Sequence, residues 1–508
     1  MAIGIVLCFY TFRVHKYSGL KDKVIRSDGI GYYAYLPAIF IYKDLSLGFL
    51  KNKDLIDSDA GSIVPYGEDK VVNKYSVGLA ILQLPFFLLA YFLSFLFNQP
   101  IDGFNIIFHT CFLVANLVYF TVGLIFLGKL LNLFKVKLWL IVMTLILFSF
   151  GNSILHYIVY DAYLSHSFSL SLMIILVYYI FKFQENQKKG YLIGIGWIFG
   201  LIVLLRPVNL LAILFFPSLF TNSKELLLSL RLFINNIAFV LIPFVLTIAI
   251  QLLIWYVQTG DFLVYSYGGE KFIWGSHDLM FAFLGYRRGF YVYNPIWLLF
   301  ICYYVYRIRD IAFSLAWLIV AFILLGLVLS SWHNTLYGMC LGYRAMLEYQ
   351  IFLLIPVLHL FKVGLRYKWA TMATYSVLIA FSVCYSVIIA MQYRQCIIPW
   401  VGPNAKQYWE VFGKTDDRYN YHFFYPQQQK DTDSDTIQFS INRNDIFSDT
   451  GFTIYPQLPD GSVLTGVGFY ANVVAERPHF ASGTFCFFIG DSLCAWKHKL
   501  ISKDVKIQ

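Results

Sequence analysis

Charged residues are scarce in this chain of 508 residues: they make up 13% of it, while hydrophobic residues make up 59%. A soluble globular domain usually carries about 25% charged residues. This shortage of charge excludes an ordinary soluble enzyme, a disordered chain and a coiled coil. A polytopic membrane protein fits the composition. The 19% share of aromatic residues also suits a membrane protein, because tyrosine and tryptophan rings favour the membrane–water interface.

Motifs that would identify common soluble enzymes are lacking as well. The sequence contains no phosphate-binding P-loop, no GxGxxG dinucleotide motif and no GxSxG nucleophile turn. No basic and aromatic stripe suggests a nucleic-acid partner, so the net charge of +10 is better explained by basic cytoplasmic loops. Internal repeats, which many transporters show, are not evident either.

Cysteine pairs with metal-ligand spacing are missing too. None of the cysteines forms a CxxC pair, and most are expected to be small apolar fillers, at positions 8, 111, 302, 340, 384, 396, 486 and 494. The cofactor is therefore unknown, and a divalent metal stays an open alternative without a clear ligand motif. Cys486 and Cys494 flank an expected turn and could form a disulfide in an oxidising compartment.

Long apolar runs dominate residues 1–403, and they predict an all-α polytopic membrane domain, because a helix satisfies its own backbone hydrogen bonds in lipid. We count about eleven segments, at 1–12, 78–97, 106–128, 138–158, 163–181, 191–217, 232–256, 291–306, 311–331, 346–361 and 369–391. The first run is too short to span ~30 Å and lacks the leader and cleavage site of a signal peptide. It is either a short tilted helix, or the true start lies upstream.

Three polar stretches interrupt this pattern. Residues 13–77 and 257–290 are predicted to be large outer loops, and 404–508 contains no membrane segment. Within that tail we expect a linker at 404–434. Short alternating runs divided by turn signals then predict a small β-rich extracytoplasmic domain at 435–508.

Lysine and arginine in the short linkers predict the orientation, since cytoplasmic loops are enriched in both. Basic linkers at 129–137, 182–189, 224–231, 307–309 and 362–368 are assigned to the cytoplasm. The loops at 98–105, 157–166, 257–290 and 331–345 then face outside, together with the tail. Two runs fit poorly: 191–217 should be two half-helices broken at Arg206-Pro207, and 78–97 could be re-entrant or interfacial.

The most informative polar stretch follows the first apolar run directly. It contains Asp28, two glycines and the tyrosines Tyr32 and Tyr33. A carboxylate at a membrane surface can act as a general base on a hydroxyl, and the tyrosines could hold a polar substrate. The alternative is a solvated carboxylate that caps the following helix.

Other polar residues stand close to the predicted membrane segments. Lys74 and Tyr75 end the first loop, where the lysine could meet a phosphate or anchor a helix at the headgroups. Asp161 lies between two membrane segments, where acidic residues are costly and often functional, although it could also cap a helix. Arg206 interrupts an apolar run and needs a partner, either a lipid phosphate or an internal acid.

The later outer loops add a further set. Glu270 precedes the adjacent pair Arg287 and Arg288, which suits a phosphate headgroup or anionic lipid in general. His333 and Arg344 form another outer cluster, with Glu348 following, although a histidine here is more often an ordinary interfacial residue.

The layout of residues 1–400 resembles the GT-C glycosyltransferase superfamily, in particular the bacterial group with protein O-mannosyltransferases and lipid A aminoarabinose transferases. The resemblance is carried by the order of Asp28, Lys74, Asp161, the Leu205-Arg206-Pro207 motif and the blocks Arg287-Arg288-Gly289-Phe290-Tyr291 and Gly342-Tyr343-Arg344. Better-known members often have Asp-Glu where this chain has Asp28-Gly29, and Lys-Pro-Pro-Leu where it has Lys74-Tyr75-Ser76-Val77.

This resemblance implies a glycosyltransferase that takes sugar from a polyprenyl-phosphate donor in the lipid bilayer. The acceptor is unknown. Asp28 would deprotonate the acceptor hydroxyl, which attacks and inverts the anomeric carbon, and Asp161 would orient acceptor or sugar. Lys74, Arg287, Arg288 or Arg344 would stabilise the leaving phosphate. The resemblance also places the protein in the inner membrane, with its outer loops and tail in the periplasm.

Three other functions stay open. A multi-span polysaccharide polymerase or ligase would also handle lipid-linked glycans, with its key residues on a later outer loop. A transporter or flippase would move a lipid-linked glycan without cleaving it. A scaffold would use the tail to bind a partner or a glycan.

Overall fold

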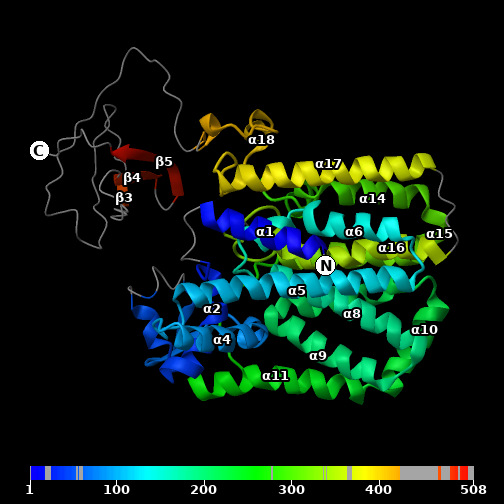
Figure 1. Ribbon diagram of the computed structural model, residues 1–508, viewed down its shortest axis with the longest axis horizontal. Coiled ribbons are helices and arrows are strands. Elements are labelled where there is room, and N and C mark those ends of the chain that lie inside the picture. Colours follow the sequence, from blue (N-terminus) through cyan, green and yellow to red (C-terminus); the bar gives the residue numbers. More distant parts are fainter. Residues whose placement is uncertain are drawn as a thin grey trace, which may run out of the picture. The chain divides into compact units, whose positions relative to one another are not determined.

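The computed structural model describes residues 2–17, 24–52, 55, 61–275, 278–335, 337–338, 340–362, 369–420, 422–423, 467–470, 481–489 and 492–501. The chain divides into two compact units, Met1–Met391 and Gln392–Gln508, which are described separately. The first contains the helical bundle in Figure 1.

Seven helical segments in the described part of the chain are long and apolar enough to cross a membrane, so the protein is a multi-pass membrane protein. They are α4 (Gly78–Leu96), α5 (Ile106–Leu133), α8 (His166–Asn186), α11 (Ala238–Thr259), α15 (Ile308–Ser330), the 3-10 helix η4 (Arg344–Tyr349) continued by α16 (Gln350–Lys362), and α17 (Trp369–Arg394). Eleven segments were predicted, so the structure contains fewer full-length spans than the sequence suggested.

The difference comes from apolar helices that are shorter than a membrane is thick. These are α1 (Ala2–Tyr17), α6 (Leu138–Phe150), α9 (Lys189–Leu205), the 3-10 helix η3 (Pro207–Leu219) and α14 (Pro295–Tyr306). The 13 residues of α6 rise only about 20 Å, against a hydrocarbon core of ~30 Å. The short run at the N-terminus and the half-helices of 191–217 were expected, but the runs at 138–158 and 291–306 had been counted as complete segments because apolar composition alone does not show where a helix ends.

The run at 191–217 is broken where the sequence predicted a break. Helix α9 ends at Leu205, and Arg206 has extended backbone angles (φ −155°, ψ 117°) before Pro207 begins η3. A residue before proline is driven out of the helical region, because the proline ring collides with its backbone. The predicted pair of half-helices is therefore confirmed, and Arg206 stands between them.

The first polar stretch, 13–77, contains regular structure rather than a plain loop. Its elements are α2 (Asp28–Tyr33), α3 (Tyr35–Pro37), the π-helix η1 (Ala38–Tyr42), the 3-10 helix η2 (Gly48–Lys51), and strands β1 (Ile63–Tyr66) and β2 (Lys70–Asn73). The two strands form an antiparallel hairpin that pairs Ile63 with Asn73. This hairpin delivers Lys74 and Tyr75 to the start of α4.

The remaining elements are short or peripheral. In the first unit they are α7 (Ile154–Val159), α10 (Ser223–Asn235), α12 (Leu279–Leu284) and α13 (Phe290–Tyr293). In the second unit they are α18 (Ala405–Glu410), the 3-10 helix η5 (Asp417–Tyr419), and strands β3 (Val467–Tyr470), β4 (Ala481–Ile489) and β5 (Ser492–Ile501).

The strands of the tail form an antiparallel sheet in the order β3-β4-β5. Its register sets Cys486 opposite Trp496 rather than opposite Cys494. Most of the tail lies outside the described residues, including 424–434 of the predicted linker and the turn at Gly490-Asp491. The β-rich domain and the disulfide therefore stay predictions.

Close packing through small residues holds the bundle together, as is common between helices in lipid. A side chain at Gly123 of α5 would lie 2.8 Å from Ser171 of α8. A side chain at Gly200 of α9 would lie 2.6 Å from Thr247 of α11. Helix α8 is therefore fixed between α5 and α9, and α11 packs on the other side of α9.

The two ends of this bundle differ in chemistry. Helix α8 begins at His166 and runs for 21 residues, so about 30 Å separates its start from the basic linker that contains Lys188. In Figure 1 helix α2 lies at one end of the bundle and α10, from the linker at 224–231, lies at the other. This separation agrees with the sequence-based assignment of inner and outer loops, which stays a prediction.

Candidate functional site

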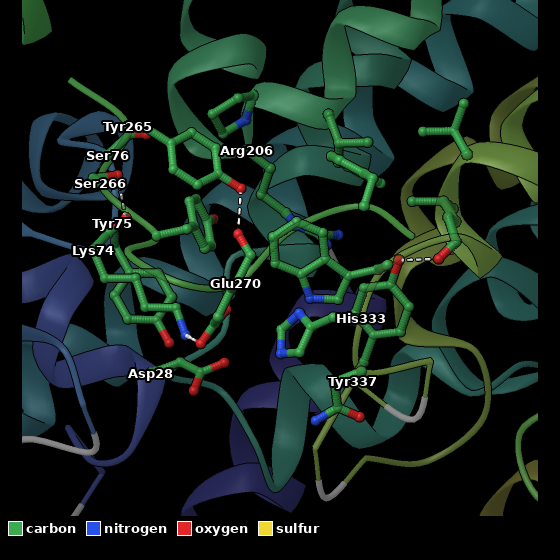
Figure 2. Close-up of a pocket in the computed structure, with 18 of the residues that line it drawn as sticks. Asp28, Lys74, Tyr75, Ser76, Arg206, Tyr265, Ser266, Glu270, His333 and Tyr337 are labelled. Atoms are coloured by element: carbon green, nitrogen blue, oxygen red, sulfur yellow. Dashed lines mark hydrogen bonds and ion pairs between the residues drawn. The ribbon is translucent and has the colours of Figure 1, made fainter. Parts of the chain in front are cut away.

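A cavity of about 760 Å³ opens at the end of the bundle where α2 lies. Its lining comes from α2, residues 74–76 before α4, the Arg206 break, residues 264–274 and residues 328–344. Figure 2 shows acidic, basic and aromatic side chains meeting in it. The cavity brings together eight of the predicted site residues: Asp28, Tyr32, Lys74, Tyr75, Arg206, Glu270, His333 and Arg344.

Asp28 stands in the first turn of α2, and its carboxylate accepts a hydrogen bond from Arg344 Nη2 at 3.0 Å. Burial alone would raise the pKa of Asp28, but the charge of Arg344, a hydrogen bond from Tyr75 and the charge of Lys74 together lower it below its ordinary value. Asp28 is therefore ionised at neutral pH. It is not the fully solvated helix cap that was the alternative.

The glycines after Asp28 permit this placement. A side chain at Gly29 would lie 2.6 Å from Tyr163, and one at Gly31 would lie 2.3 Å from the ring of Tyr75. Distances below 3.0 Å are not tolerated by real side chains, so α2 can approach these tyrosines only because both positions are glycine. The pattern of an acid beside glycines is thus a packing requirement of the site.

Lys74 and Glu270 form an ion pair at 2.5 Å on one side of the cavity. The ammonium of Lys74 also lies over the rings of Tyr75 and Tyr267, 5.7 and 5.6 Å from their centres. Figure 2 shows Asp28 close to this pair. Lys74 therefore faces the cavity and carries a positive charge toward it, but it already has an internal partner.

Arg206 belongs to a buried group of three side chains. Its Nη1 atom donates to Glu348 at 2.8 Å, and the other carboxylate oxygen of Glu348 lies 2.8 Å from Nδ1 of His166. Glu348 is fully buried, whereas Arg206 and His166 line the cavity. The internal ion pair, which was the alternative for Arg206, is thus present, and the guanidinium still borders the cavity.

Asp161 lies behind the cavity rather than in its lining. Its carboxylate contacts Arg26 Nη2 and His156 Nε2, each at 3.0 Å, and the guanidinium of Arg26 lies over the ring of Tyr163. Burial would raise the pKa of Asp161, but the charges and hydrogen bonds of His156 and Arg26 hold it well below its ordinary value. Arg26 precedes Asp28 by two residues, so this group fixes the start of α2.

Three other predicted residues also lie away from the cavity. Tyr33 donates to the carbonyl of Gly103 at 2.7 Å and packs among phenylalanine rings. Arg288 is buried and donates to the carbonyl of Gly338 at 2.8 Å. Arg287 is exposed and does not belong to the cavity lining. The structure thus does not place the Arg287-Arg288 pair beside Asp28.

His333 lines the cavity, with its ring 5.0 Å from that of Trp332. Its backbone N–H donates to the carbonyl of Lys271 at 3.0 Å, which joins two of the loops that were predicted to face outside. Sequence reasoning assigned no role to His166, Tyr267 or Trp332, although all three line the cavity. The signal for His166 was its position at the start of a membrane span, where a polar residue is costly.

One wall of the cavity is apolar. It is formed by η3, α11 and α15, through Val208, Leu210, Leu211, Trp255, Val328 and Leu329. Leu210 in this wall is 48% exposed. The cavity therefore combines a charged side with an apolar wall.

Within the described ranges, no group of three or more histidine, cysteine, aspartate or glutamate side chains is placed to hold a metal ion. Comparison with known proteins adds no relative: no family model, no curated protein and no solved structure matches the chain.

Proposed function

We propose that this protein is an inverting glycosyltransferase that moves a sugar from a polyprenyl-phosphate donor to a lipid, glycan or protein acceptor. In this proposal it lies in the inner membrane and works at the periplasmic face. The observation that carries the proposal is an ionised carboxylate, Asp28, paired with Arg344 in a cavity that also has an apolar wall. Such a cavity suits a substrate with an anionic head and a long apolar tail.

In the proposed reaction, Asp28 accepts the proton of the acceptor hydroxyl. The hydroxyl oxygen then forms a bond to the anomeric carbon of the donor, on the face opposite the phosphate. The bond between that carbon and the phosphate oxygen breaks, and the electron pair leaves with the phosphate, which stays on the lipid. Positive charges aimed at the departing oxygen lower the barrier, and this role is proposed for Arg344, which lines the cavity.

The pairing of Asp28 with Arg344 supplies a reason for ordered binding. Before the donor binds, the charge of Arg344 lowers the pKa of Asp28, so the carboxylate is a weak base. A phosphate bound to Arg344 would cancel part of that field, and the pKa of Asp28 would rise toward a value useful for proton transfer. The donor would thus prepare the base for the acceptor.

Asp161 takes a different part from the one that the resemblance implied. Because its carboxylate contacts Arg26 and His156 and does not line the cavity, it is a positioning residue in this proposal. It holds Arg26, and through Arg26 it holds the turn that presents Asp28. Arg206 and Lys74 supply further positive charge around the donor phosphate.

A polysaccharide polymerase or ligase is the second candidate. One observation favours it: the outer stretch 264–274 contributes Tyr265, Tyr267 and Glu270 to the cavity, so a later outer loop does take part in the site. Such an enzyme would tolerate Asp28→Asn but not substitutions in that loop.

The test is mass spectrometry of surface glycans and glycolipids in cells without this gene, complemented at matched membrane expression. Wild type should restore a missing sugar, and Asp28→Asn should not. Asp69→Asn, an exposed acid in the β1–β2 hairpin, is the matched control and should restore it fully. Full restoration by Asp28→Asn would reject Asp28 as the base, and the polymerase or transporter functions would then be favoured.

A further inference from the structure

The chain that follows α11 lines the cavity and also exposes large apolar side chains, of which Phe262 and Leu263 lie outside the cavity lining. We call residues 261–274 the strap. Val264 and Ser266 are buried and line the cavity. Between and beside them, Leu263 is 81% exposed and Tyr265 is 59% exposed. Residues 262–263 form a bend and residues 266–269 a turn, and Phe262 (52% exposed) and Leu263 are adjacent exposed residues that do not belong to the cavity lining.

The strap is held in place at several points and is not a loose loop. The ion pair between Lys74 and Glu270 fixes its middle, and the hydroxyl of Ser266 donates to the carbonyl of Lys74 at 2.9 Å. Its last residues pair with the chain after α15, since the backbone N–H of Ile273 donates to the carbonyl of Ser331 at 2.6 Å. The exposed side chains are therefore presented in a fixed arrangement.

The exposed face of the strap continues the surface of a membrane span. Phe262 stacks on Tyr256 of α11, with ring centres 4.5 Å apart and planes at 12°. Tyr256 and its neighbour Val257 are themselves exposed on α11. The 22 residues of α11 rise about 33 Å, enough to cross a hydrocarbon core of ~30 Å, so the strap begins where that core ends.

From this continuity we infer that the strap is a membrane-contacting surface whose partner is the interfacial layer of the bilayer. Tryptophan and tyrosine favour this layer, where one part of the ring is dry and the other can reach water. Trp274, 68% exposed, and Tyr265 both border the cavity as well. The rim of the cavity therefore lies at the depth of the lipid headgroups, and a lipid headgroup can reach the cavity without its tail leaving the bilayer.

The experiment uses the full chain in vesicles of phosphatidylethanolamine and phosphatidylglycerol. The photoreactive residue benzoylphenylalanine replaces Leu263 or Trp274, and mass spectrometry identifies what each position labels. Leu253, exposed in the middle of α11, is the positive control. Glu68, exposed in the β1–β2 hairpin turn, is the water-facing control.

We expect lipid adducts at Leu263 and Trp274 at yields similar to Leu253 and about tenfold above Glu68. Labelling of Leu253 alone, or cross-links from Leu263 and Trp274 to another part of the same chain, would overturn the inference. Neither result depends on the proposed reaction, so a failure here leaves the glycosyltransferase proposal to its own test.

Discussion

The buried group of Arg206, Glu348 and His166 allows a quantitative test of the site's architecture. Glu348 has no exposed surface, while the side chain of Arg206 retains 14% exposure toward the cavity. Removing one partner of a buried ion pair leaves an uncompensated charge and costs about 3–5 kcal/mol. We expect Arg206→Met to lie at the upper end of that range, because Glu348 cannot reach water and keeps only His166 as a partner. Glu348→Leu should lie at the lower end, because Arg206 can.

The double variant Arg206→Met/Glu348→Leu removes both charges, so its cost should fall well below the sum of the two single costs. The coupling should amount to about 1–3 kcal/mol. The assay is reversible unfolding in mixed dodecylmaltoside and SDS micelles, followed by circular dichroism. The exposed pair of Lys182 and Glu185 supplies the control, and Glu185→Gln should show no measurable loss. Additive single costs, within about 0.5 kcal/mol, would refute the claim that these residues form one unit.

Three further predictions concern the charged groups around Asp28. Asp161→Asn should lower the rate of transfer but keep donor binding, because it weakens the contact that holds Arg26 and leaves the cavity lining in place. Equal losses of rate and binding, measured as kcat and KM, would contradict this. Arg344→Lys should lower the rate of sugar transfer by about 10²- to 10³-fold, because one positioned hydrogen-bond donor to a developing oxyanion contributes a factor of that size. A near-normal rate in a vesicle assay would exclude Arg344 from phosphate stabilisation. The pKa values of Asp28 and Asp161 are lowered on folding. Their contribution to stability is therefore complete above the ordinary carboxylate pKa of about 3.9, and it is lost as pH falls through the lower folded values. Thermal unfolding between pH 7 and pH 3 should show this loss below about pH 4, and Asp161→Asn should reduce the loss.

The sequence predicted the part of the site that depends on chain topology. The predicted residues of this part stand at or near helix ends: Asp28 begins α2, Lys74 lies four residues before α4, Arg206 follows α9 and Arg344 begins η4. In a membrane bundle, helix ends on one side of the bilayer meet, so residues at such ends are brought together without knowledge of the packing. That is why most predicted residues line one cavity.

The sequence could not show which of the predicted site residues would lie outside the cavity lining. Asp161 and Arg288 both belong to stretches predicted to face outside, but neither lines the cavity: Asp161 pairs with Arg26 and His156, and Arg288 donates to the carbonyl of Gly338. Such pairings depend on how helices rotate against one another, and apolar runs contain no signal for rotation. The role of Glu348 was missed for the same reason, because its partners are far away in the chain.

Helix length set the other limit. A run of apolar residues predicts burial in lipid or protein, but α6 and α14 are too short to span a bilayer alone. Their ends are set by local chemistry, such as Gly151 after α6 and Asn294 before α14. Counting apolar runs therefore gave more spans than the structure contains.

The most direct test of the central proposal follows the bond that the reaction would break. Purified protein is reconstituted in vesicles made from the lipid extract of cells that lack this gene, so that unused donor and acceptor are present. Mass spectrometry then measures the glycosylated product and free polyprenyl phosphate over time. We predict that wild type produces the two in equal amounts and that Asp28→Asn produces neither. Movement of an intact lipid-linked sugar across the bilayer, with no polyprenyl phosphate released, would contradict the proposal and favour a transporter.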